Sequence, residues 1–445
     1  MKRLLLILLL LPLITKAQII TTFAGGGTSS PNGIPAITAQ IPGATGGVFD
    51  SHFNYYFVGY STSALVYKID TAGIITVFAG TGIAGYNGDG GKADTSMLRQ
   101  PYAVIVDTLD NVYIADAGNN RIRKVDVITG IISTIAGNGI AGFSGDGGLA
   151  IDAALNFPDN ICFDKNGNLY IADGNNFRIR VINVSGTITT YAGNGTVGIG
   201  GNGGPATLAQ ILAYGLCVDD SNNLYFSGAS VGQCRIGKIN EWTGIVTTFG
   251  GTDTGYVYNG DNIPATSANM APTTIRFDNT FKNLYLTDCT NNRIRTIDVN
   301  GIIHTVVGNG IEGFSGDNGN ALDAELYYPS GLIFDSCCSL YFGDQFNNRI
   351  RKAAFNPFCW PEKVNNILVQ NISVYPNPAY DILNINNITT PTTYALLNII
   401  GTTMQQGTLK AGDNSISVQS LPPGIYLLQL TDNDQQKTVR KIVKE

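Results

Sequence analysis

The sequence predicts an all-β fold built from a repeated four-stranded sheet, on two observations. A phrase close to GIITTxAGNGxxGxxGDGGxA, followed by a YIAD-like run, recurs six times between Ile19 and Phe355 at spacings of 55–60 residues. A steady period of this length is typical of a solenoid or a propeller. Each repeat also holds four short runs rich in Ile, Val, Tyr, Phe and Thr between Gly, Asn and Asp turns, as antiparallel strands do. Four strands per repeat predict the blade of a β-propeller.

The second repeat shows the four expected strands most clearly: Tyr102–Asp107, Asn111–Ala115, Arg121–Asp126 and Ile131–Ala136. The two ends of the repeat region are incomplete. Ile19–Ala24 matches a fourth strand with no first three before it, and the last repeat, Pro329–Phe355, lacks a fourth strand. An open ring would expose a strand edge. We therefore expect six blades, with Ile19–Ala24 completing the last one.

Three segments carry a family resemblance. Asp116–Arg123, Asp288–Arg295 and Asp344–Arg351 resemble NHL repeats, and the resemblance extends in register over Ile19–Phe355. It implies a six-bladed propeller, in agreement with the repeat count. NHL propellers serve mostly as binding platforms, and a minority are lyases.

The N-terminus predicts a secretory signal peptide over residues 1–17. A basic start is followed by the apolar run Leu4–Ile14 and by Thr15-Lys16-Ala17, which is similar to a cleavage site. The apolar run is too short to span a membrane. We expect residues 18–355 to form the propeller, 356–370 a linker, and 371–445 a small β-sandwich, with no transmembrane segment in the mature chain.

The C-terminal region carries a second resemblance. Ser373–Ile385, Leu421–Leu427 and Lys437–Glu445, in this order, closely resemble the type A sorting domain of the type IX secretion system. The resemblance implies a Bacteroidetes origin, recognition by the type IX machinery, export across the outer membrane, and an extracellular or surface-attached product. An ordinary accessory sandwich domain is the alternative.

The composition argues against nucleic acid as a partner. Charged residues make up 13% of the chain, the net charge is −6, and no basic block is present. Binding to phosphate backbones needs clustered Lys and Arg. The 54 Gly residues fit a fold with many tight turns.

A polar signature, Asp-x-x-Asn-x-Arg, recurs where the second strand of a repeat turns into the third. We expect its Asp and Arg to pair across the hairpin, and its Asn to satisfy turn amides or adopt a left-handed conformation. Recurrence in four repeats favours a structural role, and the first and fourth repeats depart from it, with Tyr60 and Gly228 in place of Asp. The signature comprises Asp116, Asn119, Arg121, Asp173, Asn176, Arg178, Asp288, Asn291, Arg293, Asp344, Asn347 and Arg349.

Loops of about 20 residues link each repeat to the next, and loops of that length are often functional. They lie on the same side as the Asp-x-x-Asn-x-Arg turns, so we expect a ligand to bind on this long-loop face. The loop Asp residues are expected mainly to form turns and cap the following Ala-x-x-Ala segment. With one such Asp per loop, calcium is a weaker alternative, and we expect no cofactor. The candidate ligand-binding residues are Tyr86, Asp89, Phe143, Asp146, Tyr256, Asp261, Phe314 and Asp317.

Catalytic motifs are scarce. The two His residues, His52 and His304, fall in different repeats and are not expected to converge. First-strand Asp residues recur by register at 107, 164, 219, 278 and 335, which favours structure. Two functions stay open: a non-enzymatic binding or adhesion module for a glycan or protein, and a surface lyase or hydrolase acting on polysaccharide or peptide at the channel mouth.

The seven Cys residues cannot all pair internally. Export makes disulfides possible. We expect one bridge, Cys338 to Cys359, on the face opposite the long loops. Cys162 and Cys217 share one repeat position and are expected to be buried free thiols.

Overall fold

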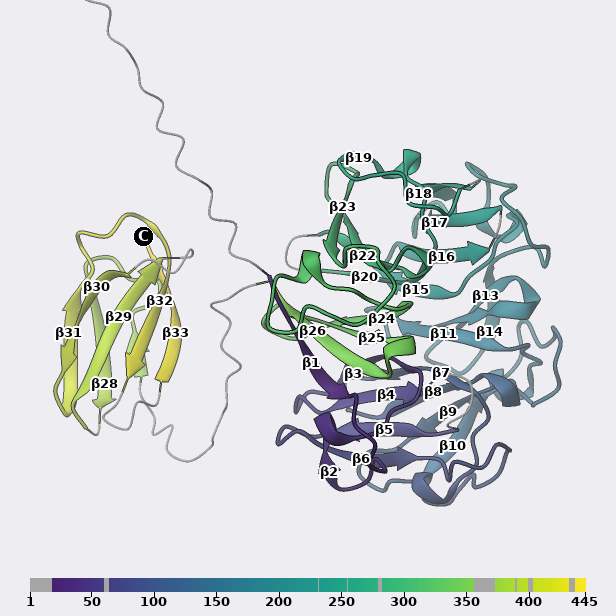
Figure 1. The fold of residues 1–445 in the computed structure, drawn as a ribbon, viewed down its shortest axis with the longest axis horizontal. Helices are drawn as coiled ribbons and strands as arrows, with labels where there is room; N and C mark the ends of the chain where they lie inside the picture. The colour runs from purple at the N-terminus through teal and green to yellow at the C-terminus, as the bar shows by residue number, and fades with distance from the viewer. Residues whose placement is uncertain are drawn as a thin grey trace, which may run out of the picture. The chain divides into compact units, whose positions relative to one another are not determined.

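The computed structural model describes residues 18–59, 64–230, 232–253, 255–278, 282–355, 373–388, 390–398, 403–431 and 437–445. The expected signal peptide, the linker and Tyr60 lie outside these residues. The chain divides into two compact units, Met1–Pro357 and Phe358–Glu445, which are described separately (Figure 1).

The described part of the first unit contains six antiparallel sheets, each with four main strands. The first three are β3 (Ala44–Phe49), β4 (Tyr55–Gly59), β5 (Val66–Ile69), β6 (Ile74–Ala79) with the short β2 (Ile34–Pro35); β7 (Pro101–Val106), β8 (Val112–Asp116), β9 (Arg121–Val125), β10 (Ile132–Ala136); and β11 (Pro158–Phe163), β12 (Leu169–Asp173), β13 (Arg178–Ile182), β14 (Ile188–Ala192).

The other three sheets follow the same order, except that the last one takes its outer strand from the start of the chain. They are β15 (Gly215–Val218), β16 (Leu224–Ser230), β17 (Gln233–Ile239), β18 (Val246–Asp253); β20 (Pro272–Phe277), β21 (Leu284–Asp288), β22 (Arg293–Ile297), β23 (Ile302–Val307) with β19 (Ile263–Pro264); and β24 (Pro329–Phe334), β25 (Leu340–Asp344), β26 (Arg349–Ala354), β1 (Ile19–Gly25).

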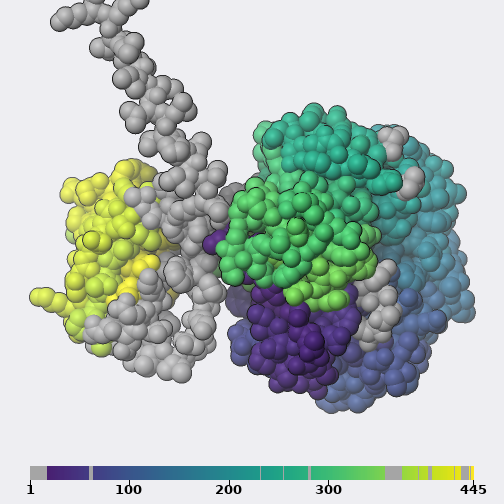
Figure 2. Space-filling model, viewed as in Figure 1, coloured from purple at the N-terminus to yellow at the C-terminus, as the bar shows by residue number. Residues whose placement is uncertain are grey.

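The first strand of each sheet lies toward the middle of the unit (Figure 1). These inner strands contact one another in cyclic order, β3, β7, β11, β15, β20, β24 and again β3. Strand β1 pairs antiparallel with β26, with Ile20 opposite Ala353. Figure 2 shows the N-terminal segment lying against residues from the end of this unit. The arrangement is that of a β-propeller.

Aromatic side chains fill the junction between the first and last sheets. The ring of Phe23 meets those of Tyr55 and Tyr341 edge-on at centroid distances of 5.6 and 4.9 Å. Phe49 packs against Tyr341 at 4.9 Å. These residues come from opposite ends of the unit's sequence, so their packing joins the first sheet to the last.

The long loops cover the outer edges of the sheets. In the loop before the second sheet, Gly90 N–H donates to the carbonyl of Ile132, and Ile132 N–H donates to Gly91. Similar bonds join Gly147 to Ile188 and Ile20 to Gly319. The outermost strand of these sheets is therefore not left as an open edge.

Short 3₁₀ helices occur at two recurring places. The helices of the long loops are η1 (Ala36–Thr38), η2 (Ala93–Thr95), η4 (Ala150–Asp152), η6 (Ala206–Leu208), η7 (Ala265–Ser267) and η9 (Ala321–Asp323). The helices of the second-to-third strand turns are η3 (Ala117–Asn119), η5 (Gly174–Asn176), η8 (Cys289–Asn291) and η10 (Gln345–Asn347).

The second unit contains two antiparallel sheets around one apolar core. Leu383, Leu396 and Leu428 are fully buried in this core. The strands are β27 (Ser373–Tyr375), β28 (Ile382–Ile388) and β31 (Gly412–Ser417) in one sheet, and β29 (Thr392–Asn398), β30 (Thr403–Leu409), β32 (Gly424–Thr431) and β33 (Lys437–Lys444) in the other. Among the described residues, no helix is long and apolar enough to cross a membrane.

Candidate functional site

A buried arginine cluster recurs on the long-loop side of four sheets. In the second sheet the guanidinium of Arg123 is fully buried and lies 3.4 Å from the carboxylate of Asp116 and 2.6 Å from that of Asp89. Asp116 ends β8, and Asp89 comes from the long loop. The same arrangement surrounds Arg180, Arg295 and Arg351.

This geometry corrects the pairing expected from the sequence. The Asp of the signature pairs with the second Arg of the strand, not with the first. Asp116 lies opposite Arg121 in the ladder, but the Arg121 guanidinium donates to the carbonyls of Asn119 and Asn138. Arg121 and Arg123 lie on the same face of β9, since they are two residues apart. Arg123 is the one that lies within reach of the loop carboxylate of Asp89, whereas Arg121 lies at the turn.

The Asn of the signature ties this turn to the long loop. Asn119 Nδ2 donates to Asp116 at 2.8 Å and to the loop carbonyl of Gly85 at 2.7 Å. The left-handed residue is the next one, Asn120, with φ of 54°. The equivalents of Asn119 bond the long loop in the same way: Asn176, Asn291 and Asn347.

An aromatic ring from the long loop covers each cluster. The guanidinium of Arg121 lies 3.6 Å from the ring centre of Tyr86, and Arg123 lies 5.0 Å from it. Phe143 and Phe314 cover the matching Arg pairs in the third and sixth sheets. Tyr86, Phe143 and Phe314 remain 40–42% exposed. Each ring is therefore held on a cation and still open to solvent.

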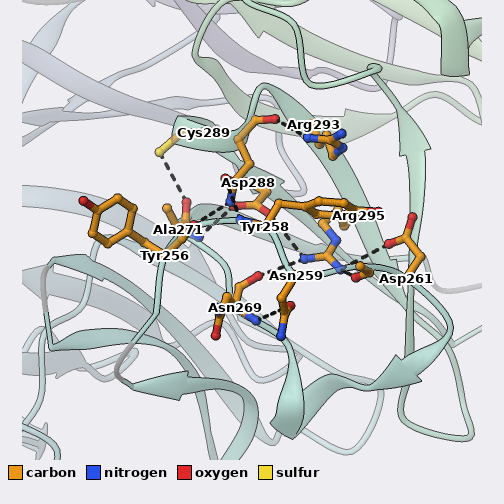
Figure 3. A network of polar contacts seen from close by, with 12 residues as sticks. Tyr256, Tyr258, Asn259, Asp261, Asn269, Ala271, Asp288, Cys289, Arg293 and Arg295 are labelled. Carbon is orange, nitrogen blue, oxygen red and sulfur yellow. Dashed lines mark hydrogen bonds and ion pairs between the residues drawn. The ribbon is translucent and has the colours of Figure 1, made fainter.

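In the fifth sheet this position belongs to Tyr258, not to the predicted Tyr256. Tyr258 lies 4.0 Å over Arg293 and 4.9 Å over Arg295. Figure 3 shows Arg295 between Asp288 and Asp261, with Tyr256 turned away from them. The two tyrosines are two residues apart, so a small shift in loop register decides which one covers the cluster.

The loop Asp residues do not cap the helices that follow them. The 3₁₀ helix η4 has no side-chain cap, and the Asp146 carboxylate instead accepts hydrogen bonds from Arg180 and Thr190. The buried Arg is the stronger partner because a charge-assisted bond exceeds a neutral one. Among the described residues, no three His, Cys, Asp or Glu side chains gather closely enough to hold a metal ion.

The first and fourth sheets lack the Asp and Arg positions of this cluster, but the fourth keeps a buried Arg235 at the position of Arg121, 3.8 Å from Asp253. By register, Tyr67 and Gly237 replace Arg123, and Asn32 and Asn202 replace Asp89. In the fourth sheet a Cβ on Gly237 would lie 2.2 Å from the ring of Phe226. In the first sheet Phe57 stacks on Tyr67 at 5.1 Å. Aromatic side chains thus fill the place of Arg123 in both sheets.

The other recurring polar residues also have structural partners. Asp107 accepts hydrogen bonds from the backbone of Leu109 and Asn111 and from the hydroxyl of Tyr113, and Asp164, Asp219 and Asp335 hold their own turns with backbone bonds. His52 contacts Asp110, whereas His304 contacts Asn262. The two His side chains lie in separate sheets and do not converge.

The cysteines correct one expectation and support another. Cys337 is disulfide-bonded, whereas the sulfur of Cys338 is a thiol. The expected Cys338–Cys359 bridge is therefore wrong in its use of Cys338; Cys359 lies outside the described residues. Cys162 and Cys217 are buried free thiols, as expected, and burial raises the pKa of Cys162 to about 12.

Two inner-strand residues that the sequence interpretation passed over break the repeat. Arg276 stands where the other inner strands have Val48, Ile105, Cys162, Cys217 and Ile333. It lines a pocket with those Val, Ile and Cys side chains from four neighbouring strands, and among the described residues its guanidinium has no ion pair. A comparison of the repeats at each inner-strand position would have found it.

Asp159 is the second inner-strand residue that departs from the repeat. Tyr102, Tyr214, Thr273 and Ser330 hold its position in other sheets. Asp159 is 9% exposed, and desolvation, followed by the charge of Asp173, raises its pKa to about 8. The half-buried Tyr214 of the next sheet has a raised pKa through burial and the charge of Asp159.

Asp159→Asn is expected to stabilise the protein at alkaline pH. The unfolded chain loses this proton near its ordinary pKa of 3.8, but the folded protein keeps it up to about pH 8. Stability therefore falls as the pH rises through this window, and the amide removes that loss. Thermal unfolding at pH 4 and pH 9 should show a higher midpoint for the variant at pH 9 and little change at pH 4. An equal shift at both values, or the same shift in the exposed control Asp152→Asn, would contradict the assignment.

Each of the two units is similar to known proteins. Residues 373–445 match the secretion system C-terminal sorting domain, and residues 141–200 match the teneurin NHL domain. The protein "SUPPRESSOR OF QUENCHING 1, chloroplastic" of Arabidopsis thaliana is 31% identical over 58% of this chain and 25% of its own length. NHL repeat-containing protein 2 of Bos taurus is 35% identical over 21% of this chain and 13% of its own. The chain thus spans a quarter or less of these curated relatives.

A solved structure shares the fold of the first unit. An auxiliary nutrient binding protein from Bacteroides thetaiotaomicron has a TM-score of 0.55 and 18% identity, and the match covers 75% of each chain. The protein therefore combines an NHL-type β-propeller with a C-terminal sorting domain. The sorting domain directs export across the outer membrane to the cell surface or the extracellular space.

Proposed function

We propose that the first unit is a closed six-bladed propeller that works outside the cell as a non-enzymatic binding module for a glycan or protein. In this proposal residues 18–355 form the ring and β1 completes its last blade, while residues 371–445 engage the type IX secretion machinery and 356–370 join the two. The cyclic contacts of the inner strands and the pairing of β1 with β26 support the ring.

The observation that carries the binding function is the set of arginine-backed aromatic rings. Tyr86, Phe143 and Phe314 each rest one face on a guanidinium and remain 40–42% exposed. Rings fixed in this way lose little conformational entropy when a ligand stacks on them, and aromatic side chains dominate many binding sites. Their repetition around one face suits a ligand with repeated units, such as a glycan.

The loop carboxylates have a supporting role in this proposal. Asp89, Asp146, Asp261 and Asp317 hold the buried Arg residues, and their side chains are 24–38% exposed. Their oxygens can accept hydrogen bonds from ligand hydroxyls beside the rings. A binding role is compatible with the fold shared with the auxiliary nutrient binding protein of Bacteroides thetaiotaomicron.

Phe143→Leu combined with Phe314→Leu is expected to weaken ligand binding at least about tenfold, the equivalent of about 1.4 kcal/mol. Leucine keeps an apolar cover over each Arg but removes the flat ring. Glycan and protein arrays would identify a ligand, and titration calorimetry would compare the variants. Ile140→Ala, which changes an exposed apolar side chain of one of these loops, is the matched control. Unchanged binding by the double variant would show that the two rings do not contact the ligand.

The same arrays separate binding from the alternative, a lyase or hydrolase acting on polysaccharide or peptide. Product release is monitored on every positive ligand. A binding module leaves the ligand intact over long incubation. Turnover that is lost in Asp159→Asn would replace the binding proposal with the enzymatic one.

A further inference from the structure

Asp159 has properties that its structural neighbours do not explain. It is the second residue of the inner strand β11, and it is about nine-tenths buried. No described residue donates a hydrogen bond to its carboxyl group. Other buried polar atoms without partners, such as Ser330 Oγ, are sealed from solvent, whereas the Asp159 oxygens are not. The carboxyl group is therefore accessible and without a partner in the described protein.

A second departure from the repeat makes room for this carboxyl group. Gly174 stands where other sheets have Ala117, Cys289 and Gln345. A Cβ on Gly174 would lie 2.0 Å from Asp159 Oδ2, far inside van der Waals contact. Gly174 has no positive φ, so backbone conformation does not require glycine there. The two departures fit each other, because the glycine provides the space that the carboxylate fills.

The charges around Asp159 leave it without a cation. The acidic group whose charge acts on it is Asp173, whose own partner is Arg180 at 3.5 Å. Tyr214, at the equivalent position of the neighbouring sheet, has a raised pKa through burial and the charge of Asp159 and adds no positive charge. A buried carboxylate with no positive partner is costly, and a ligand cation would remove that cost.

We propose that Asp159 binds the primary ammonium group of a lysine side chain on a ligand. A four-carbon stem can carry an ammonium group to a carboxylate that is nine-tenths buried while its methylenes contact apolar surface. The ammonium of an amino sugar is attached directly to the ring and cannot reach as deeply. The aromatic rings of the long loops are not part of this site, although Asp173, which acts on Asp159, belongs to the Arg180 cluster that Phe143 covers.

The pH dependence of binding follows from the same carboxyl group. It must ionise to hold an ammonium group, and its pKa is about 8. The lysine side chain itself stays protonated, since its ordinary pKa is about 10.4. The affinity should therefore rise by about tenfold per pH unit between pH 6 and 8 and then level off.

Titration of the full chain with Nα-acetyl-lysine amide tests the site, with the Nε-acetylated compound as the neutral analogue. We expect binding of the charged compound at pH 8, at least about tenfold weaker binding of the neutral one, and a similar loss in Asp159→Asn. Gly174→Ala, which pushes the carboxylate aside, should also weaken binding, and Asp152→Asn should not. Near-ultraviolet circular dichroism confirms that each variant is folded.

Three results would overturn the proposal. Equal affinity for the charged and neutral compounds would show that the ammonium group is not recognised. Full binding by the folded Asp159→Asn variant would show that the carboxylate does not hold the ligand. Tighter binding of glucosamine than of the lysine compound would assign the site to amino sugars instead. Because the aromatic rings are unchanged in all these variants, the outcome does not depend on the long-loop proposal.

Discussion

Arg123→Met is expected to destabilise the protein by about 3–5 kcal/mol, because it leaves a buried charge without its partner. Asp116 is fully buried, and its only cation in the described structure is Arg123. Burial already raises the pKa of Asp116 to about 6 despite that partner. Removing the guanidinium also frees Asp89 from its shortest ion pair, 2.6 Å.

Urea unfolding at pH 7.5 measures this cost, and two variants make the result specific. Arg121→Met should cost about 1 kcal/mol or less, since Arg121 bonds carbonyl groups and is not paired with a carboxylate. Asp116→Asn should recover much of the loss when it is combined with Arg123→Met, because no buried carboxylate then remains. A cost for Arg121→Met as large as that of Arg123→Met would restore the pairing first expected from the sequence.

The first and fourth sheets show that the fold does not require the buried ion cluster in every sheet. Both lack an Arg at the position of Arg123, the loop Asp and the covering ring, and both place aromatic side chains at that position, although the fourth keeps Arg235 near Asp253. Replacing a buried ion cluster by well-packed apolar groups is often neutral or stabilising. The cluster is thus one of two solutions to the same packing problem within one chain.

Deletion of residues 18–25 is expected to destabilise the first unit by about 5 kcal/mol or more, since several buried side chains are lost together. Ile20 and Ala24 are fully buried, and Phe23 packs on Tyr55 and Tyr341. The deletion also exposes the edge of β26, which invites aggregation. Thermal unfolding and light scattering would measure both effects. Ile19→Ser, at the exposed end of β1, should change little. A deleted chain that melts like the full one would show that β1 is not part of the ring.

The strands could be predicted from the sequence because each turn between them is determined by residues that are close in the sequence. Each second-to-third strand turn is set by neighbouring residues, so the repeat predicted the strands over 102–136 to within a residue or two. The partner of Asp116 was not local. Both Arg121 and Arg123 lie on the same face of the strand, and the one that pairs is set by a loop carboxylate more than 30 residues away.

The candidate sites were harder to predict for a related reason. The repeat makes the residues that its copies share easy to recognise, and those residues have structural roles. Asp159 and Arg276 each occur once, at inner-strand positions where the other repeats carry different residues. Their significance depends on burial and on missing partners, which only the three-dimensional arrangement shows. Tyr256 and Tyr258 could not be separated without the register of their loop.

Closure of the ring by β1 is the central claim, and a register-specific cross-link tests it most directly. Thr21 lies opposite Lys352 of β26, whereas Lys124, the equivalent residue of the second sheet, lies opposite Ser133. Thr21→Cys with Lys352→Cys should form a disulfide under mild oxidation, identified by mass spectrometry of proteolytic fragments, since directly opposed strand residues are within bridging distance. Thr21→Cys with Lys124→Cys should form none. Absence of the first cross-link, or equal formation of both, would contradict closure of the ring by β1.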